Sequence, residues 1–252
     1  MTYDDLRQVT PQAAVLLQDN PGPMTLDGTN TWLLGRGGAI VVDPGQGEDP
    51  DRHVPALLAA AADVELIVVT HRHHDHAELA PALHAATGAP VRAADPTLCL
   101  GGAPLADGEL LAAGGVEAQV LATPGHTSDS ICLLLDSGPV LTGDTILGRG
   151  TTVVAHPDGA LAPYLDSLAR LRELGDRLVL PGHGPQLPSL AVTAGQYLAH
   201  RSQRLDQVRA ALETLGADAS ARQIVEHVYA DVDESVWWAA ELSVRAQLDY
   251  LR

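Results

Sequence analysis

The sequence lacks lysine and phenylalanine and contains only two cysteines. All fifteen basic residues are arginine and stand against 32 Asp and Glu, so the formal net charge is −17. An acidic surface repels polyanions at long range, and broad affinity for nucleic acid depends on basic side chains that neutralise phosphates. The composition therefore disfavours a protein that grips nucleic acid through wide phosphate contact. It still permits a local site for one phosphate or carboxylate.

Signals for export and for membrane insertion are also absent. Cys99 and Cys132 stand in no C-x-x-C pattern, so we interpret them as free thiols of a reducing compartment. The first ten residues, M-T-Y-D-D-L-R-Q-V-T, have neither the basic nor the apolar region of a signal peptide. No apolar run reaches the length of a membrane span. These absences predict a cytoplasmic chain that does not contact membranes.

Hydrophobic periodicity divides the 252 residues into two parts. Short apolar runs separated by turns predict strands over 31–34, 39–42, 64–70, 116–122, 130–135, 140–142, 153–154 and 177–180. Helical spacing predicts helices over 53–62, 77–87 and 163–174. After about Pro188 the pattern is helical throughout, with runs over 192–215 and 234–251 and a capping box at 220–223. We therefore expect two domains, 1–188 and 189–252.

A repeated pattern gives the first functional signal. In four places an apolar strand ends, a small or turn residue follows, and a His or Asp comes next: His71, His126, Asp144 and His183. Ligands and catalytic groups gather at strand ends, where loops converge on one edge of a sheet. The pattern predicts that these four side chains meet.

The stretch I-V-V-T-H-R-H-H-D-H at 67–76 contains four histidines and an aspartate. In extended chain His71 and His73 share a face, because residues two apart point the same way. Asp75 and His76 follow where the chain turns toward the next helix. The spacing H-x-H-x-D-H therefore predicts two pairs of ligands for two neighbouring metals.

The remaining candidates complete two metal sites. We predict that the first metal is bound by His71, His73 and His126, the second by Asp75, His76 and His183, and that Asp144 bridges them. Imidazole and carboxylate ligands suit zinc, with iron and manganese as alternatives, so two Zn²⁺ are the expected cofactors. Two such ions about 3.5–4 Å apart can share a bridging hydroxide, a strong nucleophile at neutral pH.

Four motifs carry a family resemblance. T-H-R-H-H-D-H, T-P-G-H-T, L-T-G-D-T and L-P-G-H-G, in this order, resemble the metallo-β-lactamase superfamily over roughly the first 185 residues. The resemblance implies an α/β fold, an αββα sandwich with the metals at one edge, and metal-ligand roles for the same seven residues. The segment N-P-G-P-M-T-L-D-G-T-N-T-W-L-L-G and the helical C-terminal part are similar to the β-lactamase-like endoribonuclease branch, which implies a winged-helix-like second domain. True β-lactamases match less well, since they commonly have cysteine where Asp144 stands.

Several further residues are candidates with two interpretations. Asp43 either orients a ligand histidine or is a turn aspartate before proline. Arg149, Thr151 and Thr152 follow Asp144 in a glycine-rich stretch, which either contacts an anionic substrate group or is a plain loop. Asp75 could act both as a ligand and as the catalytic proton acceptor or donor. His74 lies outside the ligand pattern, and we interpret it as facing solvent or supporting a ligand. The other histidines, His200 included, are assigned no role.

The substrate has competing interpretations. The branch resemblance favours cleavage of single-stranded RNA, whereas the acidic charge favours an ester or thioester hydrolase of glyoxalase II or thioesterase type that acts on a small acyl substrate. An iron-dependent persulfide oxygenase would use fewer of these ligands, so the metal content would distinguish it. A DNA-binding regulator would need a basic recognition helix, which the C-terminal part lacks, so we expect no sequence-specific DNA binding there. The long helix from Val192 could form a homodimer interface.

Overall fold

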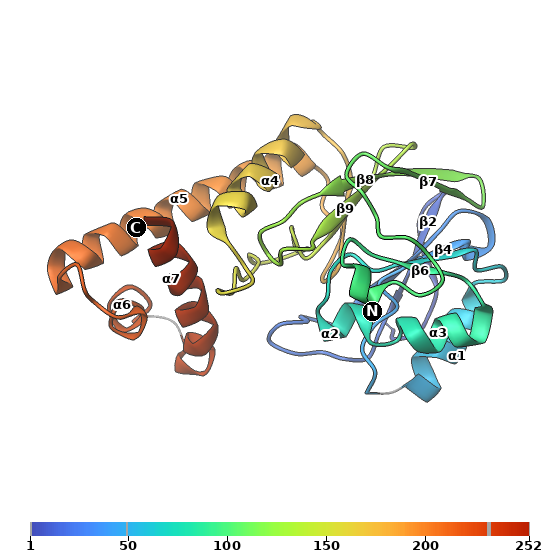
Figure 1. The fold of residues 1–252 in the computed structure, drawn as a ribbon, viewed down its shortest axis with the longest axis horizontal. Coiled ribbons are helices and arrows are strands. Elements are labelled where there is room, and N and C mark those ends of the chain that lie inside the picture. Colours follow the sequence, from blue (N-terminus) through green and yellow to red (C-terminus); the bar gives the residue numbers. More distant parts are fainter. Residues whose placement is uncertain (1, 49, 231–232, 252) are drawn as a thin grey trace.

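Two β-sheets packed face to face form the centre of the computed structural model, which describes residues 2–48, 50–230 and 233–251 (Figure 1). The first sheet has six strands in the order β1-β2-β3-β4-β5-β6. They are β1 (Arg7–Thr10), β2 (Ala13–Leu17), β3 (Asn30–Leu34), β4 (Ile40–Val42), β5 (Leu66–Val68) and β6 (Val91–Arg92). The second sheet has five strands in the order β11-β10-β9-β8-β7. They are β7 (Leu110–Ala113), β8 (Val116–Ala122), β9 (Ile131–Leu135), β10 (Val140–Gly143) and β11 (Val179–Pro181).

The sheets are held together by an aliphatic core between their inner faces. Buried side chains of the first sheet, such as Trp32 and Val68, pack in one cluster with Val120, Leu133 and Leu180 of the second. Because phenylalanine is absent, Trp32 supplies the largest fully buried side chain. Its indole Nε1 also donates a hydrogen bond to the Pro181 carbonyl at 3.0 Å, so the two sheets are joined by a polar contact as well.

Helices cover the outer faces of both sheets. On the first sheet, α1 (Pro50–Ala60) and α3 (Ala80–Thr87) bury Leu57 and Leu83 against Ile67. On the second sheet, α4 (Leu161–Glu173) and the start of α5 (Leu190–Leu215) form another cluster that includes Leu168 and Tyr197. The order helix, sheet, sheet, helix confirms the predicted αββα sandwich. The short helices are α2 (His74–Ala77), η1 (Arg36–Gly38), η2 (Pro96–Leu98) and η3 (Glu234–Val236).

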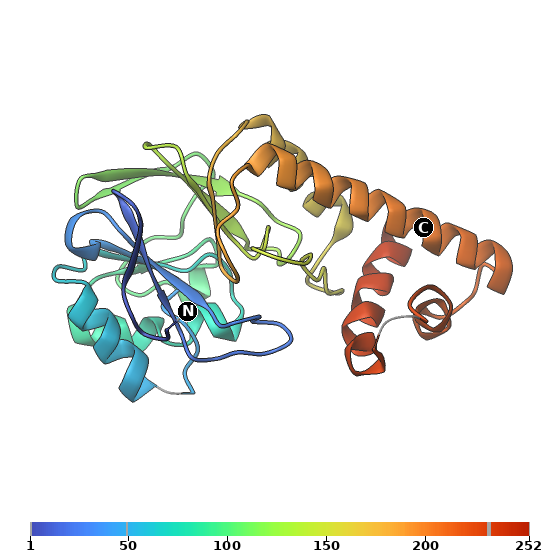
Figure 2. The same ribbon diagram turned by 180° about the vertical axis from the view of Figure 1, so that it is seen from behind.

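The C-terminal helices form a separate small core. The distal half of α5 packs with α6 (Ala221–Val228) and α7 (Trp237–Leu251), burying Val208, Ile224 and Val244. The predicted capping box is present, since Ser220 accepts from the Gln223 N–H and the Gln223 side chain accepts from the Ser220 N–H. Since α5 contributes to both this core and the one beneath α4, it links the two parts (Figure 2). The boundary at 188/189 stays a prediction.

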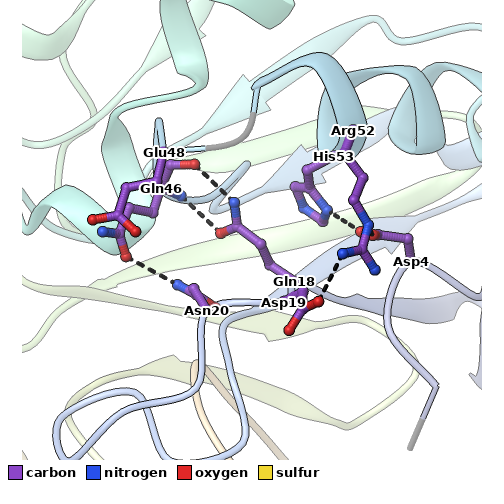
Figure 3. A pocket seen from close by; sticks show the side chains of 8 residues that line it. All are labelled: Asp4, Gln18, Asp19, Asn20, Gln46, Glu48, Arg52 and His53. Carbon is purple, nitrogen blue, oxygen red and sulfur yellow. Dashed lines mark hydrogen bonds and ion pairs between the residues drawn. The ribbon is translucent and has the colours of Figure 1, made fainter.

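The N-terminal segment is tied to the first sheet by polar contacts (Figure 3). The Asp4 carboxylate contacts His53 Nδ1 at 2.6 Å and Arg52 Nε at 2.7 Å. His53 is buried, and its Nε2 lies 3.1 Å from Thr31 Oγ1 on β3. Nearby, Gln18 donates to the carbonyl of Gln46 and accepts from its N–H. These contacts fix the loop that follows β4.

Strand direction places the functional loops together. β4 and β5 are parallel, as are β10 and β11, and β8 runs the same way as β10 because both are antiparallel to β9. The carboxyl ends of β8, β10 and β11 therefore lie at one edge of the second sheet, and those of β4 and β5 share an edge of the first. The loops that carry His71, His126, Asp144 and His183 all start at these ends.

Two local predictions were wrong. Residues 153–154 are not a strand: the Val153 carbonyl accepts from a histidine ring rather than from a neighbouring strand. The helix expected over 77–87 begins at Ala80 as α3, and a separate short helix, α2, precedes it from His74, so Asp75 and His76 lie in a helical turn. Within the described ranges, no helix is long and apolar enough to cross a membrane.

The core between the sheets gives a stability prediction. Leu133 on β9 is fully buried, whereas Leu110 on the edge strand β7 is 65% exposed. Leu133→Ala leaves a cavity and should lower the free energy of unfolding by about 2–5 kcal/mol. Leu110→Ala, the matched control, should change it by less than about 0.5 kcal/mol. Urea unfolding of both variants measures the difference, and equal losses would contradict the inter-sheet core described here.

Candidate metal centre

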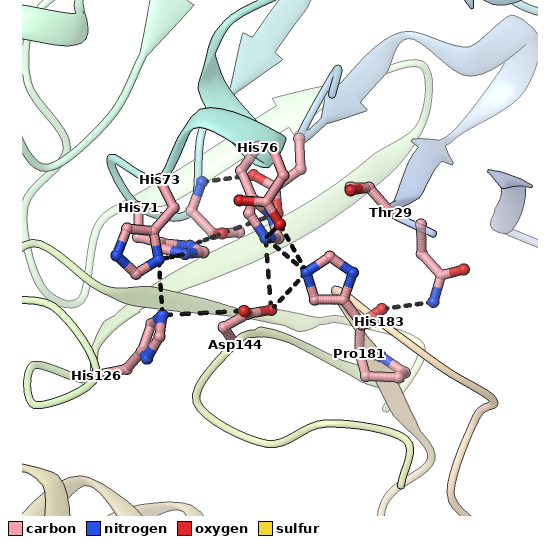
Figure 4. A network of polar contacts seen from close by, with 12 residues as sticks. Thr29, His71, His73, His76, His126, Asp144, Pro181 and His183 are labelled. Carbon is pink, nitrogen blue, oxygen red and sulfur yellow. Dashed lines mark hydrogen bonds and ion pairs between the residues drawn. The ribbon is translucent and has the colours of Figure 1, made fainter. Parts of the chain in front are cut away.

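Seven side chains from four loops converge at one edge of the sandwich (Figure 4). Three histidines form the first group. His73 Nδ1 lies 3.1 Å from His71 Nε2 and 3.0 Å from His126 Nε2. The structure thus brings together the three residues predicted for the first metal, although His126 is 53 residues from His73 in the sequence.

The second group consists of Asp75, His76 and His183. His183 Nε2 lies 2.9 Å from Asp75 Oδ2 and 3.1 Å from His76 Nε2. The distance from His76 Nε2 to Asp75 Oδ2 is 3.4 Å. These are the three residues predicted for the second metal. Because α2 turns the chain after His73, Asp75 and His76 face His183 rather than His126.

Asp144 lies between the two groups. Its Oδ1 is 3.5 Å from the Nε2 atoms of both His76 and His183, and its Oδ2 is 3.9 Å from His126 Nε2. The Oδ1 atom is buried and has no hydrogen-bond partner among the described residues. An ionised buried oxygen without a donor is costly. Its position is that expected for a carboxylate that bridges two cations.

The histidine rings are oriented by hydrogen bonds to their outer nitrogens. His126 Nδ1 lies 2.8 Å from the Val153 carbonyl, and His183 Nδ1 lies 3.0 Å from the Gly28 carbonyl. A carbonyl only accepts, so each Nδ1 carries a proton and each Nε2 is the nitrogen that can bind a metal. His71 and His76 are fixed in the same way, by the Thr70 hydroxyl and by Asp43. Four rings thus point their Nε2 atoms into the centre.

The donor set fits divalent metals. In the first group, facing lone pairs on neutral imidazoles repel one another, and a cation between them removes the repulsion. Zinc–nitrogen bonds of 2.0–2.1 Å in a tetrahedral site place two ligand nitrogens about 3.3 Å apart. The nitrogen–nitrogen distances of 3.0–3.1 Å within each group are close to that value. The residues therefore fit one metal in each group with Asp144 between them.

Burial and neighbouring charges shift the pKa values of the two groups of histidines in opposite directions. Burial lowers the pKa of His71 well below its ordinary value, and that of His73 to about 4. Burial acts in the same direction on His76 and His183, but the surrounding carboxylates outweigh it and raise their pKa. The first group is therefore neutral and ready to bind a metal, whereas a metal at the second group would displace protons.

The two carboxylates of the centre are ionised. Burial alone would raise the pKa of Asp75, but the neighbouring charge of His76 outweighs it and holds that pKa far below its usual range. Asp144 behaves similarly, with His183 as the leading opposing charge. Both carboxylates thus carry the negative charge that two divalent cations would require.

Asp43 supports the centre from behind. Its carboxylate accepts from the Thr70 N–H at 2.7 Å, the Thr70 hydroxyl at 2.8 Å and His76 Nδ1 at 2.9 Å. Asp43 is buried and has a φ of 55°, which is uncommon for a residue other than glycine and is typically kept at functional sites. Behind it, the Thr31 hydroxyl donates to the Asp43 carbonyl and links it to His53. Asp43 therefore lies in contact with a candidate ligand histidine, as expected for a residue that orients one.

Gly182 explains part of the L-P-G-H-G motif. A Cβ atom at this position would lie 2.7 Å from Asp144 Oδ1 and 2.8 Å from His76 Cε1. Real Cβ atoms do not approach so closely, so only glycine lets the chain before His183 pass beside the other ligands.

The other residues that were candidates from the sequence lie outside the group of seven proposed ligands. The exposed Arg149 is paired with Asp27, with Nη–Oδ distances of 2.5 and 2.8 Å. The Thr152 hydroxyl is buried and donates to the Asp144 carbonyl at 2.6 Å. His74 is 85% exposed on its side chain and contacts Glu78. Substrate contact by Arg149, Thr151 and Thr152 stays a prediction.

Two of the groups that orient the rings have no signal in the sequence. The carbonyls of Gly28 and Val153 are backbone atoms, so no residue type marks them. The segment around Gly28 lies far from the ligand motifs in sequence, and an isolated bridge between Thr29 and His183 brings it to the centre. Long-range contacts of this kind require the fold.

Comparisons with known proteins agree with this geometry. Residues 24–183 match the family model described as the metallo-beta-lactamase superfamily, and residues 220–252 match the beta-lactamase associated winged helix domain. The beta-lactamase-like protein 2 homolog of Drosophila melanogaster is 30% identical over 97% of this chain and 89% of its own. An atrochrysone carboxyl ACP thioesterase of Aspergillus fumigatus is 32% identical over 82% of this chain and 67% of its own. A metallo-beta-lactamase family protein from Thermus thermophilus shares the fold, with a TM-score of 0.80 and 24% identity over 96% of this chain and 94% of its own.

The contacts of Asp43 predict an effect on metal affinity. In Asp43→Asn an amide N–H₂ would face either Thr70 or the Nδ1–H of His76, so one acceptor is lost and the ring is no longer fixed. We expect zinc affinity to fall about 10- to 100-fold, as is usual when a group that orients a metal-binding histidine is removed. Competition with a chromophoric chelator measures it. Asp27→Asn, on the exposed Arg149 pair, is the control, and unchanged affinity in Asp43→Asn would contradict the orienting role.

Proposed function

The chain belongs to the metallo-β-lactamase superfamily, and we propose that it is a di-zinc hydrolase that cleaves the thioester or ester bond of an acyl substrate. The family model covers more than half of the chain, and the relatives match most of the remainder. Members of this superfamily are metal-dependent hydrolases, and the cluster of histidines and aspartates agrees with that chemistry. The identity of the metals and of the substrate is our proposal.

The observation that carries the proposal is the pairing of the two arginines on the loops that carry metal ligands. Arg72, between the ligands His71 and His73, lies within 3.6 Å of the carboxylates of Asp95, Asp129 and Asp158. Arg149, five residues after Asp144, is paired with Asp27. Affinity for RNA depends on cations that are free to neutralise phosphates. These two arginines are already neutralised, and the chain has a net charge of −17.

A relative supports the same choice. The Aspergillus fumigatus protein that is 32% identical to this chain is named a carboxyl ACP thioesterase. Hydrolysis of a thioester adds water across the bond and gives a carboxylic acid and a thiol. Phosphodiester cleavage in single-stranded RNA, the rival prediction, uses the same kind of metal pair but has to overcome the acidic charge around it.

The proposed ligands form two groups of three, with Asp144 between the groups. His71, His73 and His126 would hold one zinc ion, Asp75, His76 and His183 the other, and Asp144 would lie between them. Zinc bound here would supply Lewis acidity toward the substrate oxygen and an activated water. His73, Asp75 and Asp144 are partly exposed, whereas the other four residues are buried. The substrate would therefore approach over these three side chains.

Asp75 would also handle a proton. Its carboxylate is ionised and partly exposed, with a side-chain accessibility of 20%, so it can accept a proton from the attacking water. A thiol has a pKa near 8.5, so a thiolate leaves without first being protonated. A site that offers a proton acceptor and needs no proton donor for the leaving group therefore suits a thioester better than an ester, which leaves as an alkoxide.

The test compares substrates and histidine variants. Purified protein with quantified metal content would be offered a panel of acyl thioesters and a single-stranded RNA. We expect thioester hydrolysis, and we expect His76→Ala to lower kcat/KM at least about 100-fold because a metal ligand is lost. His74→Ala is the matched control, since His74 lies two residues away but faces solvent, and it should stay within about twofold.

The opposite pattern would overturn the proposal. If RNA is cut by the wild type and not by His76→Ala, while every thioester and ester stays intact, the endoribonuclease resemblance was the better guide. Turnover of a persulfide with oxygen and one iron per chain would point instead to the oxygenase chemistry.

A further inference from the structure

A cavity lies between the sandwich and the C-terminal helices, next to the loop that supports the metal centre. It has a volume of about 240 Å³. One wall is the loop Thr151–Val153, and the opposite walls come from α5, α7 and Tyr229. His200, Arg201 and Arg204 of α5 all line it. Figure 2 shows the C-terminal helices, in orange and red, at one end of the molecule beside the sandwich.

The two arginines of this cavity differ from the eight arginines that form ion pairs. Eight arginines form ion pairs with carboxylates, whereas in the part of the chain that the structure describes no carboxylate lies within ion-pair distance of Arg201 or Arg204. Arg201 is only 5% exposed, and its Nε is buried without a hydrogen-bond partner. A buried cation that lacks a counter-charge is costly, so its retention calls for a function.

Aromatic rings hold both guanidinium groups in place. Arg201 lies over the ring of Tyr164, 5.1 Å from its centroid, and donates to the Thr152 carbonyl. Arg204 lies over Tyr229 at 4.6 Å and donates to the Gln207 side chain at 2.9 Å. Stacking leaves the edges of a guanidinium available for hydrogen bonds. After burial, the charges of these two arginines are the causes that lower the pKa of His200, whose Nδ1 is also buried without a partner.

The loop that forms one wall also belongs to the metal centre. The Val153 carbonyl accepts from His126 Nδ1, and the Thr152 hydroxyl donates to the Asp144 carbonyl. The same Thr152 accepts from Arg201 through its own carbonyl. The cavity and the metal centre therefore share residues 152 and 153 as neighbours.

We infer that this cavity binds a phosphate group on the thiol carrier of the substrate, an inference that rests on the proposed thioester hydrolysis. Two guanidinium groups match the charge of a phosphate better than that of a single carboxylate, and their planar forks suit its oxygens. The acyl thioester at the metal centre would thus be held by a phosphate bound to Arg204 and Arg201. The acidic protein would select phosphorylated carriers through this positive site.

The first test isolates the phosphate. S-acyl pantetheine and S-acyl 4′-phosphopantetheine differ only in that group. We expect kcat/KM to favour the phosphorylated substrate, and Arg204→Gln to remove about 10- to 100-fold of that preference, the loss expected for one charge-assisted hydrogen bond. Arg204→Lys should restore part of it. Arg209→Gln is the matched control, because Arg209 lies on the same helix, is exposed and pairs with Asp206.

Direct binding separates this inference from the proposed function. Calorimetry with 4′-phosphopantetheine and pantetheine on metal-loaded protein needs no turnover. Tighter binding of the phosphorylated compound that is lost in Arg204→Gln supports the site even if no thioester is hydrolysed. Equal binding of both compounds overturns it, as does phosphate-dependent binding that Arg204→Gln leaves intact, which would place the phosphate at the metals.

The source of the phosphate is resolved by two further substrates with the same acyl group. Acyl-coenzyme A is a soluble carrier, and an acyl carrier protein presents the group on phosphopantetheine. The faster substrate identifies the source. We expect at least one of these two substrates to be hydrolysed more slowly by Arg204→Gln and at the wild-type rate by Arg209→Gln. If Arg204→Gln slows the hydrolysis of neither substrate, the inference is contradicted.

Discussion

The metal centre depends on hydrogen bonds to the outer nitrogens of its histidine rings. Four of the five rings are each held by a group that fixes which nitrogen carries the proton: a backbone carbonyl for His126 and His183, a hydroxyl for His71 and a carboxylate for His76. Without them the rings could rotate or change tautomer, and the inner nitrogens would no longer converge. Because these partners hold the rings in place, the ring nitrogens stay close to one another and to the buried Asp144 oxygen, as two metal sites require.

The sandwich supplies these partners from distant parts of the chain. Parallel strands bring the loops after β5, β10 and β11 to neighbouring edges of the two sheets, and the inter-sheet core keeps those edges together. Asp43, at the end of β4, connects the Thr70 backbone to His76, so one carboxylate joins the strand end to the ligand. The C-terminal helices then close one side and bring Arg201 against the loop that holds His126 and Asp144.

Residue types and spacing were enough to predict the parts of the centre that are made by side chains in motifs. H-x-H-x-D-H, together with three later strand ends, predicted two groups of three and Asp144 between them, and the structure brings those residues together. Prediction failed where backbone atoms or long-range packing decide. The Val153–Val154 pair looks like a strand, but Val153 serves His126 instead. His200 and Arg201 lie in an ordinary helical pattern, and only the packing of α5 against residues 151–153 gives them a cavity to line.

The position of the metals tests the two-metal centre most directly. A crystal of the zinc-loaded protein would be measured at wavelengths on either side of the zinc absorption edge, and an anomalous difference map would be calculated. We predict two peaks about 3.5–4 Å apart, one among His71, His73 and His126 and the other among Asp75, His76 and His183, with Asp144 between them. A single peak, or metal bound away from these residues, would contradict the two-metal centre.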